Sequence, residues 1–148
     1  MSLALYKKKR KFEDTPEPGA SAGKNTGQLS FVVQRHKATR LHYDFRLEMD
    51  GVIKSWAVPK GPSMNPNDKR LAMMVEDHPY EYKDFKGVIP AGNYGAGIVE
   101  IWDKGTYTAL TDDASADHKK LLKAGYKKGD LKFVLKGKNL KANLCWLR

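Results

Sequence analysis

The chain has 148 residues, of which 41% are hydrophobic, so its length and composition fit one globular domain with a buried core. Lys and Arg number 27 against 17 Asp and Glu, which gives a formal net charge of +10. This charge favours a nucleic-acid partner, because each phosphate that a cation neutralises releases counterions, although it could serve solubility alone. The single cysteine, Cys145, excludes an internal disulfide and a cysteine-based zinc site and favours a reducing, intracellular setting. No apolar run approaches the ~20 residues of a membrane-spanning helix.

Residues 1–30 are predicted to form a basic, irregular N-terminal arm. The run Lys7–Lys11 is basic, and residues 15–27 are rich in Pro, Gly, Ser and Thr without a hydrophobic period. The basic run either lies along a nucleic-acid backbone or is a solvated tail, and the sequence leaves both open. We expect residues 31–148 to form a single domain.

Short strands dominate that domain and predict an all-β fold, a small closed or partly closed barrel with one short helix. The predicted strands are 31–34, 41–48, 52–58, 71–76, 98–103, 106–110, 131–135 and 140–147. The apolar strand 71–76 is expected to be buried on both faces, and a hairpin turn is expected at Lys104-Gly105. The helix is predicted over 115–124, with Ser115 as its N-cap and Gly125 as its stop.

The strand 41–48 alternates strictly between apolar and ionisable residues. Its ionisable face carries His42, Asp44, Arg46 and Glu48, whereas an ordinary outer face carries Thr, Ser and Lys. His42 and Asp44 lie on one side, roughly 7 Å apart along the strand, a separation that one metal ion could bridge. His36 returns from the preceding connection as a third candidate ligand. Mixed imidazole and carboxylate donors suit manganese or zinc, and surface residues without a metal are the alternative.

Arginines near this strand are candidates for binding phosphate, because a guanidinium presents a planar fork to phosphate oxygens. Arg46 shares the face of the metal candidates and is the strongest of them, although it could pair with an acid instead. The further cationic candidates are Arg40, Arg70 and Lys60. His78 and Tyr82 follow a buried strand, where they could handle a proton or a phosphate oxygen, or act as a cap and a core residue.

Two stretches resemble the 3′-phosphoesterase domain of bacterial DNA ligase D and its stand-alone relatives. They are FVVQRHKATRLHYDFRLEMDGVIKSWAVPKGPS and KRLAMMVEDHPYEYKDFKGVIPAGNYGAGIVEIWDKGTY, and the resemblance extends over roughly residues 6–147. It implies a manganese-dependent hydrolase, with Zn²⁺ or Co²⁺ as alternatives at the same site. The implied reaction removes a 3′-terminal ribonucleoside to leave a 3′-phosphate, and then removes that phosphate to leave a 3′-hydroxyl for repair and ligation.

The resemblance also carries functional residues onto this chain. The implied metal ligands are His36, His42 and Asp44. The residues that match the family's catalytic and phosphate-contacting positions are Arg46, His78 and Tyr82. Lys60 and Arg70 match positions around that site and, with Arg40, stay candidates for binding phosphate. The implied supporting residues are Glu48, Glu76, Arg10 and Glu17. The implied partners are the 3′ ends of DNA or RNA-tipped primer-templates and a DNA ligase or polymerase of end joining. We expect the chain to be a monomer in the prokaryotic cytoplasm.

One departure from the family pattern concerns the second step of that reaction. Relatives often have an acid in the arm where this chain has Lys11, so an acid that helps phosphate removal would be missing. Two other classes of function stay open. A non-catalytic nucleic-acid-binding barrel would bind DNA regardless of EDTA, and a small-molecule phosphatase would accept a free nucleotide 3′-phosphate as readily as a duplex end.

Overall fold

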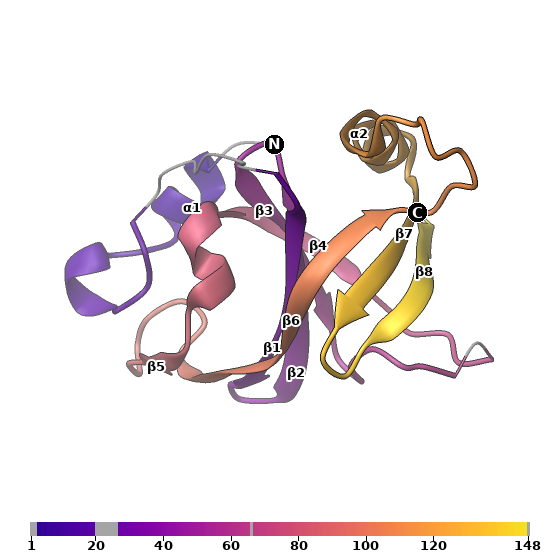
Figure 1. Ribbon diagram of the computed structural model, residues 1–148. Coiled ribbons are helices and arrows are strands. Elements are labelled where there is room, and N and C mark those ends of the chain that lie inside the picture. The colour runs from indigo at the N-terminus through magenta and orange to yellow at the C-terminus, as the bar shows by residue number, and fades with distance from the viewer. Residues whose placement is uncertain (1–2, 20–26, 66, 148) are drawn as a thin grey trace.

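The computed structural model describes residues 3–19, 27–65 and 67–147, with side chains described as far as residue 141. Its strands are β1 (Leu29–Lys37), β2 (Leu41–Met49), β3 (Val52–Val58), β4 (Met73–Pro79), β5 (Gly87–Ile89), β6 (Gly97–Ala109), β7 (Asp130–Gly137) and β8 (Lys141–Leu147). They form one antiparallel sheet in the order β4-β3-β2-β1-β6-β7-β8, with β5 paired to β6. The sheet curls into a half-barrel (Figure 1), which confirms the predicted mainly-β, partly closed barrel.

In the described part of the chain, four helical segments accompany the sheet: α1 (Ala4–Lys8), the 3-10 helices η1 (Phe12–Asp14) and η2 (Tyr80–Asp84), and α2 (His118–Lys128). The predicted bounds of the main helix, α2, are wrong. Its N-cap is Asp117, whose carboxylate accepts the Lys120 N–H, and it ends at Gly129, which adopts a φ of 80°. Gly125 lies inside α2, where an added Cβ would come within 2.9 Å of the Asp130 carbonyl, so this glycine serves close packing against β7.

Two strand predictions are also wrong. The expected hairpin at Lys104-Gly105 is the middle of the continuous strand β6. A Cβ on Gly105 would meet the Lys136 carbonyl at 2.1 Å, so the glycine lets β7 approach and does not make a turn. In the region predicted to be buried on both faces, Met73 and Met74 are 47% and 41% exposed, because β4 is an edge strand with one neighbouring strand.

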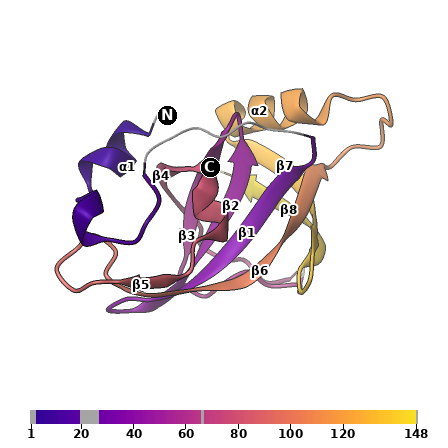
Figure 2. The ribbon, with the colours of Figure 1, turned by 60° about the vertical axis from the view of Figure 1, so that its left-hand side comes forward.

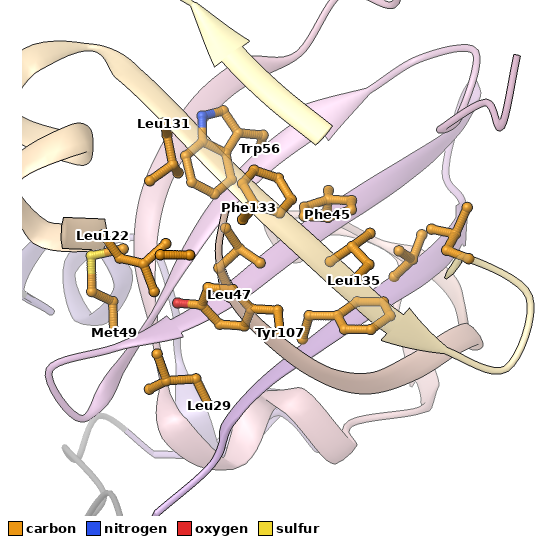
Figure 3. Close-up of a cluster of buried hydrophobic side chains, with 14 of the residues drawn as sticks. Leu29, Phe45, Leu47, Met49, Trp56, Tyr107, Leu122, Leu131, Phe133 and Leu135 are labelled. Carbon is orange, nitrogen blue, oxygen red and sulfur yellow. The ribbon is translucent and has the colours of Figure 1, made fainter. Parts of the chain in front are cut away.

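Hydrophobic side chains gather on both faces of the sheet. The larger cluster includes Phe45, Leu47 and Phe133 and is closed by Leu122 of α2 (Figure 3). The opposite face carries a smaller cluster that includes Tyr6 and Tyr82. In Figures 1 and 2, α1 and η2 lie on one side of the sheet and α2 on the other. Strand β2 is therefore covered on both sides, and its ionisable face is an interior surface.

The N-terminal arm, predicted to be irregular, contains α1 and η1 in its described part. Tyr6 is 0% exposed and Arg10 has a side chain that is 4% exposed, and their contacts with His78 and Tyr82 show that the arm packs against β4 and η2. Segment 20–26 of the arm lies outside the described residues. Among the described residues, no helix has the length and apolar character needed to cross a membrane.

Candidate metal and phosphate site

Strand pairing places the three candidate metal ligands side by side. In the antiparallel register of β1 and β2, His36 lies opposite His42, and their ring centroids are 4.7 Å apart. Asp44 follows His42 by two residues and therefore points to the same face. One ligand atom from each of the three residues lies within 4.8 Å of the other two. The structure thus brings His36, His42 and Asp44 together, as the sequence predicted.

Hydrogen bonds to the backbone fix the ring nitrogens that face the cluster. His36 Nε2 lies 2.7 Å from the Gly95 carbonyl and His42 Nδ1 lies 3.3 Å from the Arg40 carbonyl, so we assign the N–H to each of these nitrogens. The other nitrogens, His36 Nδ1 and His42 Nε2, then direct lone pairs towards Asp44, whose oxygens lie 3.5 and 3.3 Å away. Two donors that share an ion at ~2.1 Å are themselves roughly 3.0–3.5 Å apart, so this donor set fits a divalent metal.

Arg46 connects this cluster to the rest of the pocket. Its Nη2 lies 3.6 Å from Asp44 Oδ2, and both side chains are more than nine-tenths buried. Burial by itself would raise the pKa of Asp44, but the positive charge of Arg46 and the contacts with His36 and His42 together outweigh it and hold this pKa well below its usual range. Asp44 is therefore a carboxylate at all physiological pH values, as a metal ligand must be.

Two neutral side chains hold the Arg46 guanidinium in place. Its Nε donates to Gln34 Oε1 at 2.5 Å, and its Nη1 donates to Ser55 Oγ at 2.7 Å. Gln34 is itself fixed, because its Nε2 donates to the carbonyls of Tyr82 and Phe85, each at 2.9 Å. The remaining guanidinium nitrogen, Nη2, faces Asp44 and the cluster of metal-ligand candidates.

A second group of charged residues surrounds His78. Arg10, from the arm, donates from Nε to Glu17 at 2.8 Å, from Nη1 to Glu76 at 3.3 Å, and from Nη2 to His78 Nε2 at 3.4 Å. His78 Nδ1 lies 2.9 Å from the Glu76 carbonyl, so we assign its N–H there. Burial, and then the positive charges of Arg46 and Arg10, lower the pKa of His78 well below its ordinary value. His78 is thus a neutral imidazole with its Nε2 lone pair towards Arg10.

Tyr82 lies between these two groups. Its hydroxyl donates to Glu17 at 2.6 Å, and the Arg46 guanidinium carbon lies 4.7 Å from its ring centroid. Burial raises the pKa of Tyr82 above its usual range, so the hydroxyl keeps its proton. The pocket therefore offers two guanidinium groups, one neutral imidazole and one phenol, which is a donor set for a phosphate group.

Other predicted site residues make no described contact with this cluster through their side chains. Arg40 directly precedes β2 and Lys60 follows β3, and both are exposed. Arg70 donates to the Gly61 carbonyl at 3.2 Å and pairs with Asp68 at 3.4 Å. Glu48 is buried and accepts the Ser30 N–H at 2.9 Å at the start of β1. It therefore stabilises a part of the sheet that is remote from the metal-ligand candidates.

Three residues of the site carried no prediction: Gln34, Ser55 and Tyr6. Gln34 precedes His36 by two residues, so its place on the ligand face could have been read from the alternation. Ser55 contacts Arg46 across a strand pair, and the Tyr6 ring lies 5.1 Å from the His78 ring. No local pattern indicates either of these contacts.

Comparison with known sequences identifies the family. The family model of the DNA Ligase D 3′-phosphoesterase domain matches residues 34–148. The chain belongs to this family. It is 52% identical over 140 residues to the multifunctional non-homologous end joining protein LigD of Pseudomonas aeruginosa, an alignment covering 93% of this chain and 16% of that protein. It is 54% identical over 106 residues, 71% of this chain, to the multifunctional LigD proteins of Mycobacterium bovis and Mycobacterium tuberculosis.

The chain spans 16% of the length of the Pseudomonas relative and 14% of the length of the two mycobacterial ones. Membership of a phosphoesterase domain family makes the chain a hydrolase of phosphate esters. The pocket described above, with a cluster that fits a metal beside two arginines, agrees with this class of reaction.

Proposed function

We propose that the chain is a metal-dependent phosphoesterase that trims 3′ ends of DNA for end joining. It removes a 3′-terminal ribonucleoside to leave a 3′-phosphate, and then removes that phosphate to leave a 3′-hydroxyl. The observation that carries the proposal is the 3.6 Å contact of Asp44 with Arg46, which joins a set of metal-ligating atoms to a buried guanidinium group. The relatives are named as end-joining proteins, which supports a DNA end as the substrate.

The metal would be held by His36, His42 and Asp44. Two imidazoles and one carboxylate, with positions left for other oxygens, suit manganese, with zinc or cobalt as alternatives. A bound metal supplies Lewis-acid stabilisation of charge on a phosphoryl oxygen. The carbonyls of Gly95 and Arg40 accept an N–H from the two imidazoles and so aim the other nitrogen of each ring at that position.

The chain's own residues would bind and orient the phosphate. Arg46 and Arg10 neutralise its oxygens from two sides, and their positions are fixed in advance by Gln34, Ser55 and the two glutamates, so little reorganisation is needed. Tyr82 offers a hydroxyl that keeps its proton. His78 is a neutral imidazole whose Nε2 faces Arg10 Nη2 at 3.4 Å, so it helps to hold that guanidinium in position for the phosphate.

The test uses a 5′-labelled primer-template that ends in one ribonucleotide. With manganese we expect two successive products, a 3′-phosphate end and then a 3′-hydroxyl end, and with EDTA no product. Asp44→Ala should abolish both steps, whereas Asp68→Ala, which changes an aspartate of the β3–β4 loop, is the matched control. Cleavage that persists in EDTA or in Asp44→Ala would remove the metal assignment.

A further inference from the structure

The loop between β5 and β6 presents an exposed aromatic ring. Tyr94 is 46% exposed, although the two tyrosines inside the pocket are almost fully buried. Gly92 and Gly95, on either side of it, have φ values of 89° and 75°, which favour glycine and make the turn tight. The Ala96 N–H donates to the Asn93 carbonyl at 3.1 Å across the same turn. The ring is thus held outward at the apex of an ordered loop.

This ring lies next to residues of the proposed active site. The residue after it, Gly95, provides the carbonyl that orients His36 at 2.7 Å. The Arg10 guanidinium carbon lies 5.3 Å from the Tyr94 ring centroid, and the same guanidinium reaches His78 Nε2 at 3.4 Å. Tyr94 is therefore linked to the metal cluster through Gly95 and to His78 through Arg10.

Two basic side chains lie beside the same ring, and both also pair with the Glu76 carboxylate. Lys9 Nζ lies 4.7 Å from the Tyr94 centroid and 3.3 Å from its hydroxyl, and Arg10 is the second cation beside it. An exposed aromatic ring between cationic side chains is the arrangement with which proteins bind single-stranded nucleic acid, because a base stacks on the ring while the cations meet the phosphates. The ligand that fits this place is a nucleobase attached to the phosphate in the pocket.

We propose that Tyr94 is the platform on which the base of the 3′-terminal nucleoside stacks. This inference rests on the proposed phosphoesterase function and adds how the leaving nucleoside is held. The terminal base has a stacking neighbour on one side only, so it is the base that leaves its stack at the lowest cost. Held by its base on this ring, the nucleoside would place its 5′-oxygen, the leaving group, beside the pocket.

The test combines replacement of the Tyr94 ring with removal of the terminal base. Two labelled primer-templates differ only in the terminal ribose, which carries adenine in one and hydrogen in place of the base in the other. For the wild-type chain with manganese we expect kcat/KM to be roughly 5- to 150-fold higher on the base-bearing end, the range that one stacked base supplies. In Tyr94→Leu this ratio should fall close to one, and in Tyr94→Phe, which keeps the ring, it should persist. An equal loss on both ends in Tyr94→Leu overturns the proposal, since the ring would then act only by anchoring the arm.

A binding measurement in EDTA separates this proposal from the proposed function. The probe is a primer-template ending in 2-aminopurine riboside, whose fluorescence falls when the base stacks on an aromatic ring. We expect the wild-type chain to quench it and Tyr94→Leu not to. The matched control is Tyr80→Leu, because Tyr80 lies 5.0 Å from Lys83 Nζ in a similar pair on η2. Quenching without cleavage in any divalent metal would refute the phosphoesterase and keep the platform, whereas absence of quenching in the wild type overturns the platform.

Discussion

Gln34 is the residue whose replacement tests the internal support of the site most directly. It is 0% exposed, donates to the carbonyls of Tyr82 and Phe85 at 2.9 Å each, and accepts from Arg46 Nε at 2.5 Å. Gln34→Leu keeps the side-chain size and leaves three buried polar groups without this partner. Each such group costs about 1–3 kcal/mol. Allowing for partial relaxation, we expect a loss of about 4 kcal/mol in the free energy of unfolding.

The assay is urea unfolding followed by tryptophan fluorescence, in EDTA so that metal affinity does not enter. The matched control is Gln28→Leu, because Gln28 is exposed and its replacement should change stability by less than about 0.5 kcal/mol. Gln34→Leu should also lower kcat by about 100-fold, because a displaced Arg46 no longer meets the phosphate correctly. A destabilisation below about 1 kcal/mol, with kcat unchanged, would refute the network as drawn.

Three further predictions concern the strand glycine, the buried histidine and the arm. Gly105→Ala should lower the free energy of unfolding by about 2–4 kcal/mol in thermal or urea unfolding, because its Cβ would lie 2.1 Å from a carbonyl oxygen. Gly19→Ala, which has open space around the added Cβ, should change this free energy little. The pKa of His78 is lowered by folding, so the unfolded chain binds the extra proton. Stability should therefore fall as the pH drops below about 6.5, by up to about 1.4 kcal/mol per pH unit, and His78→Gln should flatten this slope in metal-free unfolding titrations. Lys11→Asp, which places an acid where the family resemblance implies one, should speed the conversion of a 3′-phosphate to a 3′-hydroxyl by about 10-fold in a single-turnover assay; an unchanged rate would show that the arm acid is dispensable.

The metal cluster could be predicted from the sequence because it depends on short-range geometry. The alternation in β2 fixes the shared face of His42 and Asp44, and one turn back to β1 brings His36 opposite. The main core followed from the same alternation, since Phe45 and Leu47 occupy the other face. Features that depend on the two-residue period of a strand could therefore be predicted from the sequence.

The remaining features depend on contacts between distant segments. Ser55 reaches Arg46 because β3 pairs with β2, and Tyr6 reaches His78 because the arm folds over the sheet. Gly105 was assigned to a turn because a glycine that admits a neighbouring strand looks the same in sequence as one that bends the chain. These errors reflect tertiary packing that no window of neighbouring residues contains.

The buried arm has a consequence for how the domain should be delimited. The family match begins at residue 34, yet Arg10 and Glu17 form one wall of the pocket. A fragment that begins at Leu29, the start of β1, would keep His36, His42 and Asp44 and lose one of the two guanidinium groups for phosphate. Such a fragment should keep its affinity for a metal ion and lose catalytic turnover. Variation confined to the first 20 residues could therefore retune the chemistry of this family while the barrel stays constant.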